Sequence, residues 1–183
     1  SQPHVKAIIT GNVIRKNDRF AEVEINWRES AFIDLERENQ AYVKYIQEGC
    51  EIEIQIKSIS DKNLSNSYSI LASYTDLVKR RKFEEIKGAI GQNVAYSAKV
   101  KSLVYGGYFL DLDGIDVFMP GSQGGMNKLI DFESLLGQEI YVCPINYDTV
   151  KNYMVVSHRA FLKTQVPLHA EVLEQGQDKA GFV

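Results

Sequence analysis

Cysteine and histidine are scarce in this chain of 183 residues. Its two cysteines, Cys50 and Cys143, lie 93 positions apart, and neither has a second cysteine or a histidine at the spacing of metal ligands. The sequence therefore predicts neither a zinc site nor a disulfide framework. We expect both thiols to be reduced and to lie in or near a core.

Long apolar segments are also missing. No apolar run approaches the ~20 residues that span a bilayer, and the N-terminus lacks the charged and then apolar stretch of a secretory signal. We expect a cytoplasmic protein with no membrane partner.

Positive charge is not in excess. The formal net charge is −3 and the isoelectric point about 5.7. A chain with this balance is not a general phosphate-binding polycation, so any contact with nucleic acid must be local.

The residue patterns of a catalytic site are absent as well. There is no GxxxxGK phosphate loop, no nucleophile beside a base and no group of metal ligands. Asp111, Asp113 and Asp116 surround Gly114, which favours a hairpin turn over a cation site. We expect no enzyme activity, no cofactor, no metal and no small-molecule substrate.

An internal repeat is present instead. GCEIEIQIKSIS begins at Gly49 and GQEIYVCPINYD begins at Gly137, an offset of 88. EVEI at 22–25 matches FLDLD at 109–113, and SAFI at 30–33 matches VFMP at 117–120, both with an offset of 87. The sequence therefore predicts two copies of one fold.

Each copy alternates apolar and polar residues with the period of a half-buried strand. The pattern predicts five strands per copy, with a short helix between the third and fourth, around 41–47 and 131–136. The predicted fold class is all-β: two tandem five-stranded OB-type barrels joined by a short linker helix.

The predicted domains are residues 1–74 and 90–166, with the linker helix at 75–89. The linker contains the run KRRK at 79–82, which either contacts phosphate or forms a solvated helix face, the reading we prefer. Residues 167–183 are expected to begin a third repeat or to form a disordered tail.

Three phrases carry a resemblance to a known family: YGGYFLDLDGIDVFMPGS at 105–122, NYMVVSHRA at 152–160 and FAEVEINWRESAFI at 20–33. Together they resemble the first two domains of the bacterial ribosomal protein S1 family, from about Val5 to Phe161. The resemblance implies two S1-type barrels at the N-terminal end of a longer RNA-binding protein.

In that family, domains that bind RNA well carry two aromatic side chains on the second strand and a histidine at the end of the third. Here Phe109 occupies one aromatic position, while Gly106 and Pro120 replace the other two side chains. Tyr105, next to Gly106, is expected to substitute in part. Phe109 either stacks under a base or is simply an exposed or interdomain-packed aromatic.

The first copy lacks these side chains, because its matching positions are Arg19, Glu22 and Ile33. The resemblance therefore implies that the first domain docks on the small ribosomal subunit through protein contacts. Trp27 and Arg28, in the turn after the second strand, are candidate docking residues together with Arg19. The alternative for Trp27 is a lid over the barrel end.

Four further residues of the second copy are candidate RNA contacts. Lys99 and Lys101 alternate along its first strand, and His158 and Arg159 follow its last strand. The alternative for each of them is a solvated side chain.

The sequence thus predicts a ribosomal protein S1-like component whose partners are proteins of the small ribosomal subunit and single-stranded mRNA. A second hypothesis is an adaptor that keeps the barrels without useful RNA affinity. A third is a pair of accessory modules on a nuclease.

Overall fold

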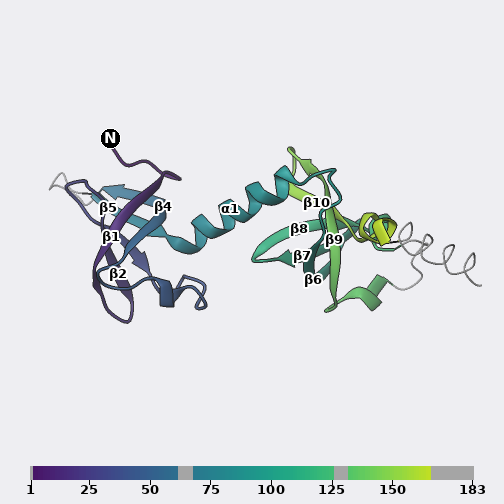
Figure 1. Ribbon diagram of the computed structural model, residues 1–183, viewed down its shortest axis with the longest axis horizontal. Helices are drawn as coiled ribbons and strands as arrows, with labels where there is room; N and C mark the ends of the chain where they lie inside the picture. Colours follow the sequence, from purple (N-terminus) through teal and green to yellow (C-terminus); the bar gives the residue numbers. More distant parts are fainter. Residues whose placement is uncertain (1, 62–67, 126–131, 166–183) are drawn as a thin grey trace, which may run out of the picture. The chain divides into compact units, whose positions relative to one another are not determined.

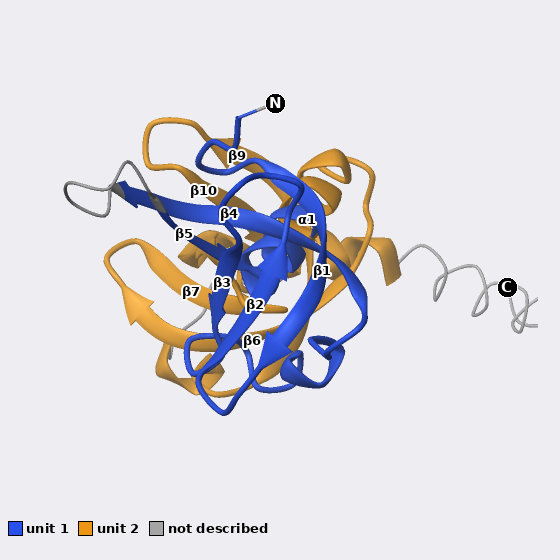
Figure 2. Ribbon diagram, turned by 90° about the vertical axis from the view of Figure 1, so that its left-hand side faces the viewer, with its two compact units in different colours: residues 1–81 blue, residues 82–183 orange. Residues whose placement is uncertain are grey.

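The computed structural model describes residues 2–61, 68–125 and 132–165. The chain divides into two compact units, Ser1–Arg81 and Lys82–Val183, each of which holds one barrel (Figure 2). Figure 1 shows the strands of each barrel and helix α1.

Barrel 1, in the first unit, is a closed sheet with strand order β1-β2-β3-β5-β4. All of its strand pairs are antiparallel except β3 with β5, which closes the barrel in parallel. A short 3₁₀ helix precedes β4. The elements are β1 (Ile8–Lys16), β2 (Phe20–Glu24), β3 (Ala31–Asp34), η1 (Val43–Tyr45), β4 (Glu51–Asp61) and β5 (Tyr68–Ser73).

Barrel 2, in the second unit, repeats this plan with the order β10-β8-β7-β6-β9. Here β8 and β10 form the parallel closing pair. The predicted fold class, two closed five-stranded barrels of the OB type, is confirmed. The elements are β6 (Tyr96–Val104), β7 (Gly107–Leu112), β8 (Ile115–Pro120), η2 (Gly121–Gln123), η3 (Phe132–Leu135), β9 (Glu139–Asp148) and β10 (Tyr153–Ser157).

The strand alternation places one face of every strand in a core. Ile54 and Ile56 of β4 are fully buried in barrel 1, and Leu110 and Leu112 of β7 are fully buried in barrel 2. Each barrel thus has its own apolar core, as a closed sheet with period-2 patterning requires.

The expectation that both thiols lie in or near a core holds for one of them. Cys143 of β9 is buried, and this burial raises the pKa of its thiol. Cys50 is exposed, because it lies in the turn before β4 and its neighbours Gly49 and Glu51 are exposed too.

The repeat between the third strands is offset by 86 residues, so the predicted offset of 87 is wrong. Ala31 and Ile33 are the buried residues of β3, and Val117 and Met119 are the buried residues of β8. Phe32 therefore corresponds to Phe118. A slip of one residue in a strand exchanges its two faces, which is why this offset matters.

Helix α1 (Tyr74–Gly88) follows β5 directly. Its N-terminus is capped by Ser73, whose Oγ accepts a hydrogen bond from Asp76 N at 2.9 Å. The buried Glu38 carboxylate accepts hydrogen bonds from Ser73 Oγ at 2.7 Å and from the backbone N of Tyr74 and Thr75 at 2.8 and 3.0 Å. The helix is therefore fixed to barrel 1 where it begins.

The division between the units falls inside α1, between Arg81 and Lys82. The predicted linker at 75–89 thus corresponds to a helix that contributes residues to both units, and the domain boundaries at 74 and 90 remain a proposal. Residues 158–165, after β10, are helical. The predicted third repeat or tail at 167–183 lies outside the described residues.

Candidate nucleic-acid interface

Three aromatic rings meet on the outer surface of barrel 2. Phe109 contacts Phe118 and Tyr153 edge to face, with ring centroids 5.7 and 5.9 Å apart. Phe118 and Tyr153 are stacked with an interplanar angle of 10° and centroids 5.0 Å apart. We refer to these three side chains as the aromatic cluster.

The sheet register explains why the rings meet. Phe109 of β7 lies directly opposite Phe118 of β8, and Phe118 lies beside Val155 of β10. Tyr153 is two residues before Val155 and so lies on the same outer face. The three rings are half-buried, because each of them packs against the other two.

Phe109 was predicted for this surface, whereas Phe118 and Tyr153 were missed. The signal was present: Phe118 stands between the apolar Val117 and Met119, and Tyr153 precedes Met154. The predicted offset of 87 aligns Phe118 with the inward-facing Ala31 and so predicts the wrong face of the strand for Phe118.

Barrel 1 carries different side chains at the same three places. Because Glu22 lies opposite Phe32, and Phe32 lies beside Leu71, the counterparts of the cluster are Glu22, Phe32 and Ser69. Glu22 forms an ion pair with Arg15 at 3.3 Å. One ring thus remains where barrel 2 has three. Ile33, which the sequence predicts to match Pro120, points into the core.

The two lysines of β6 lie beside acidic residues. Lys99 is exposed and lies directly opposite Asp111. Lys101 Nζ contacts Asp116 Oδ1 at 2.7 Å, and this hydrogen bond raises the pKa of the Lys101 ammonium. A phosphate group at Lys101 would have to compete with the Asp116 carboxylate.

Tyr105 and Arg159 line one pocket at the turn between β6 and β7. Tyr105 is fully exposed, and the pocket, with a volume of about 800 Å³, is also lined by Phe132. Arg159 Nε is buried without a hydrogen-bond partner among the described residues. The predicted RNA contacts Tyr105 and Arg159 are therefore neighbours, although they are far apart in the sequence.

Glycine is required where this turn meets β8. A Cβ atom on Gly107 would lie 2.1 Å from the carbonyl oxygen of Met119, so no larger residue fits. Gly106 has a φ of +87°, a conformation that suits glycine. The glycine at the family's aromatic position thus serves the turn itself.

His158 lies on a different part of barrel 2. Its Nδ1 is 2.7 Å from the carbonyl oxygen of Tyr141 in β9, and its ring stacks on Phe161 with centroids 6.0 Å apart. His158 and Arg159 were predicted as a pair, but their side chains have different neighbours.

Two of the predicted docking residues of barrel 1, Trp27 and Arg28, differ in exposure. Trp27 is half-buried and packs against the barrel core, as a lid would. Arg28 is exposed and forms an ion pair with Glu29 at 3.4 Å. Arg28 is thus the more accessible of the two side chains.

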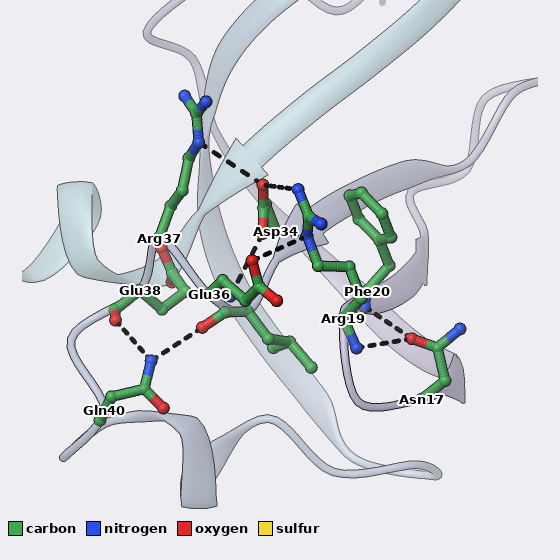
Figure 3. A network of polar contacts seen from close by, with 9 residues as sticks. Asn17, Arg19, Phe20, Asp34, Glu36, Arg37, Glu38 and Gln40 are labelled. Atoms are coloured by element: carbon green, nitrogen blue, oxygen red, sulfur yellow. Dashed lines mark hydrogen bonds and ion pairs between the residues drawn. The ribbon is translucent and has the colours of Figure 1, made fainter.

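Arg19 belongs to a network of ion pairs at the end of barrel 1 (Figure 3). Its guanidinium contacts Asp34 at 3.1 Å and Glu36 at 3.4 Å, and Arg37 also pairs with Asp34, at 3.5 Å. The hydrogen bond to Asp34 raises the pKa of Arg19 and lowers the pKa of Asp34. Arg19 also lies over the ring of Phe20, 5.2 Å from its centroid. Its charge is thus balanced within the protein.

Three side chains of the basic run at 79–82 contact groups of their own unit. Arg80 Nη1 donates to the carbonyl oxygen of Lys6 at 2.7 Å, Arg81 pairs with Glu53 at 2.8 Å, and Lys82 pairs with Asp113 at 3.2 Å. A phosphate would have to compete with these contacts, which favours the solvated helix face over phosphate binding.

Asp113 and Gly114, with φ of 52° and 88°, form the tight turn between β7 and β8, so the predicted hairpin is confirmed.

Among the described residues no group of three or more His, Cys, Asp or Glu side chains is placed to hold a metal ion. Within the same residues, every helix is too short or too polar to cross a bilayer.

The chain is distantly related to curated bS1 proteins over most of its length. It is 23% identical over 168 residues to the small ribosomal subunit protein bS1 homolog of Bacillus subtilis, covering 89% of this chain and 42% of that protein. It is also 25% identical over 189 residues to 4-hydroxy-3-methylbut-2-enyl diphosphate reductase of Clostridium acetobutylicum, covering 98% of this chain and 29% of the enzyme. The chain thus spans less than half the length of these relatives.

A solved structure of a multidomain protein with nucleic acid binding domains from Streptococcus pneumoniae matches with 18% identity. The match covers 86% of this chain and 54% of that one, with a TM-score of 0.30, which supports no conclusion about function. No protein-family model matches the chain.

Proposed function

We propose that this chain is a pair of S1-like domains that binds single-stranded RNA through barrel 2, within a protein that docks on the small ribosomal subunit and helps to hold mRNA in translation initiation. The observation that carries the proposal is the aromatic cluster of Phe109, Phe118 and Tyr153. The distant relationship to bS1 proteins supports the ribosomal role.

The chemistry of the cluster suits unpaired bases. A flat ring on an exposed strand stacks under any base, and each stacked base contributes about 1–3 kcal/mol. The neighbouring lysines face carboxylates, so we expect stacking to contribute more to affinity than phosphate contacts do. Binding should then depend only weakly on the RNA sequence and on salt concentration.

Barrel 1 has a different role in this proposal. Glu22 replaces one ring of the cluster, and a carboxylate repels the phosphates of a nucleic acid. We assign this barrel to protein contacts on the ribosome, with Trp27, Arg28 and Arg19 as the proposed docking residues. The same observation favours the second candidate function, an adaptor whose barrels bind a protein partner without significant RNA affinity.

The proposal places no catalytic step in this chain. The match to a reductase covers less than a third of that enzyme, and tandem barrels of one fold can be attached to proteins of different activities. We propose that the two barrels act as binding modules without cofactor or metal.

A titration separates the two candidate functions. The chain is titrated with a fluorescent unstructured RNA of about 16 nucleotides at two salt concentrations. RNA capture predicts a dissociation constant tighter than about 10⁻⁴ M at physiological salt, with a shallow salt dependence. Weaker binding would leave the adaptor.

Docking is tested by association with purified small ribosomal subunits. The comparison is between the unchanged chain, Trp27→Ala and Arg28→Glu, with Tyr45→Ala as a control on barrel 1. Reduced association of the first two variants, with the control unchanged, is the expected result. Equal association of all four would remove Trp27 and Arg28 as docking residues.

A further inference from the structure

Barrel 2 carries a second group of stacked aromatic rings, on β9 and the helical residues after β10. Phe161 lies against Tyr141, with centroids 5.2 Å apart and an interplanar angle of 32°. Phe161 also stacks on His158, with centroids 6.0 Å apart and an interplanar angle of 22°. Tyr141 is 53% exposed, so its ring can still accept a planar partner. We call Tyr141, His158 and Phe161 the second aromatic surface.

The second aromatic surface is separate from the aromatic cluster. Tyr153 of the cluster pairs with Asp148 at the end of β9. Tyr141 lies seven positions before Asp148 in the same strand, and the register between β9 and β10 shifts between them. At the usual rise of a strand, the path along β9 between them is at most about 23 Å. The two groups of rings thus lie toward opposite ends of β9.

The hydrogen bond of His158 determines which of its ring nitrogens is available to a ligand. A carbonyl oxygen only accepts, so the contact between Nδ1 and the Tyr141 carbonyl at 2.7 Å places a proton on Nδ1. The neutral ring then presents Nε2 as an acceptor. A ribose 2′-hydroxyl is a donor of the matching kind, and a DNA strand lacks it.

The neighbouring strand adds polar groups. Ser97 of β6 lies directly opposite Tyr141, and Lys99 lies opposite Glu139, diagonal to Tyr141 on the same face. Ser97 and Lys99 are both exposed. The Ser97 hydroxyl is a group that can contact the sugar or phosphate of a nucleotide whose base stacks, whereas Lys99 lies between the acidic residues Glu139 and Asp111.

We propose that the second aromatic surface is a further RNA site, at which a base stacks on Tyr141 and the ribose 2′-hydroxyl bonds to His158. The inference rests on the proposed function, because the RNA that reaches the second aromatic surface is the same molecule that the aromatic cluster binds. The RNA path over barrel 2 is thereby extended beyond the cluster. Folds of this type contact between about 4 and 16 nucleotides, so a strand that reaches both surfaces is within their usual range.

The test is a titration of the full chain with an unstructured RNA of about 16 nucleotides and with DNA of the same sequence. Tyr141→Ala should weaken RNA binding by about 5-fold or more, while Tyr141→Phe keeps the ring and should bind within about 2-fold of the unchanged chain. His158→Phe keeps a ring but removes Nε2, and it should lower the preference for RNA over DNA. Tyr45→Ala is the matched control, because Tyr45 is 54% exposed on barrel 1. Circular dichroism melting of each variant checks the fold.

The outcomes separate this inference from the function on which it rests. If Phe109→Ala weakens binding while Tyr141→Ala and His158→Phe do not, RNA binds at the cluster alone and the inference is overturned. If no variant changes a weak affinity, the proposed function itself fails. If Tyr141→Ala reduces association with small ribosomal subunits but leaves RNA affinity unchanged, the second aromatic surface binds a protein, which also overturns the inference.

Discussion

On barrel 2, two acidic residues lie next to the lysines that could contact RNA phosphates. Asp116 holds the Lys101 ammonium at 2.7 Å, next to a surface that we assign to RNA. Asp111 of β7 lies directly opposite Lys99 of β6. Both lysines thus have an acidic neighbour, which is why we assign RNA binding by this chain of net charge −3 mainly to stacking.

Asp116→Asn should strengthen RNA binding. The substitution removes a carboxylate and frees Lys101 for a phosphate, so the salt dependence should become steeper by about one ion. The measurement is a titration of RNA at several salt concentrations. Asp18→Asn, on barrel 1, is the control for the change in net charge. An unchanged slope for Asp116→Asn would show that Lys101 does not contact the RNA backbone.

At this scale the sequence predicts part of the site. Phe109 is found from its outward parity, but the approach of Tyr153 to Phe118 and Phe109 depends on the pairing of β8 with β10, which joins residues far apart in the chain. The exposure of Cys50 depends on a turn, and the different neighbours of His158 and Arg159 depend on the start of a helix. Strand alternation does not determine these contacts.

Among the elements, helix α1 shows how a barrel fixes the helix that comes directly after its last strand. The Glu38 carboxylate accepts three hydrogen bonds at the helix N-terminus, from a position 35 residues before Ser73. Barrel 2 has a related arrangement: Ser157 Oγ donates to Gln123 Oε1 at 2.7 Å and accepts from Ala160 N at 2.8 Å. Glu38 in barrel 1 and Gln123 in barrel 2 thus both accept a hydrogen bond from the serine that ends the last strand of the barrel.

Glu38→Ala should destabilise barrel 1 by about 2–3 kcal/mol, because it leaves buried donors of Ser73 and of the helix N-terminus without their acceptor. Glu38→Gln should cost less, since Gln123 supports the same bond in barrel 2. Urea unfolding followed by Trp27 fluorescence reports on barrel 1. Equal stability of the alanine variant and the unchanged chain would contradict this role of Glu38 at the helix start.

The strands and the order of the repeats are largely predictable, because alternation and repeated phrases are local signals. The exact offset between the third strands is not, because it depends on which residues face the core. The linker helix is predicted within one residue of α1 at each end, but the contact of Glu38 with the start of α1 joins residues far apart in the sequence.

For the molecule as a whole, two copies of one barrel carry different surfaces. Positions that hold Phe109, Phe118 and Tyr153 in barrel 2 hold Glu22, Phe32 and Ser69 in barrel 1. The proposed division between RNA binding and protein docking follows from these three positions. The copies are otherwise alike in strand order and in the parallel pair that closes each barrel.

This division predicts a gain of function. Glu22→Phe combined with Ser69→Tyr gives barrel 1 the same three kinds of side chain as the cluster, beside Phe32. In a chain that also carries Phe109→Ala, the two changes should restore part of the lost RNA affinity, by about 1 kcal/mol or more. Titration with the same RNA measures it, and melting curves check the fold. Folded variants with no recovered affinity would mean that the three positions are not sufficient.

The most direct test of RNA binding through barrel 2 compares two phenylalanines that occupy equivalent places, Phe118→Ala and Phe32→Ala. Each change removes one half-buried ring from the outer face of a third strand. The measurement is the dissociation constant for an unstructured RNA of about 16 nucleotides, with the melting temperature of each variant as the check on folding. The proposal predicts that Phe118→Ala weakens binding by about 1–3 kcal/mol while Phe32→Ala leaves it unchanged. Equal affinities of the two variants would contradict it.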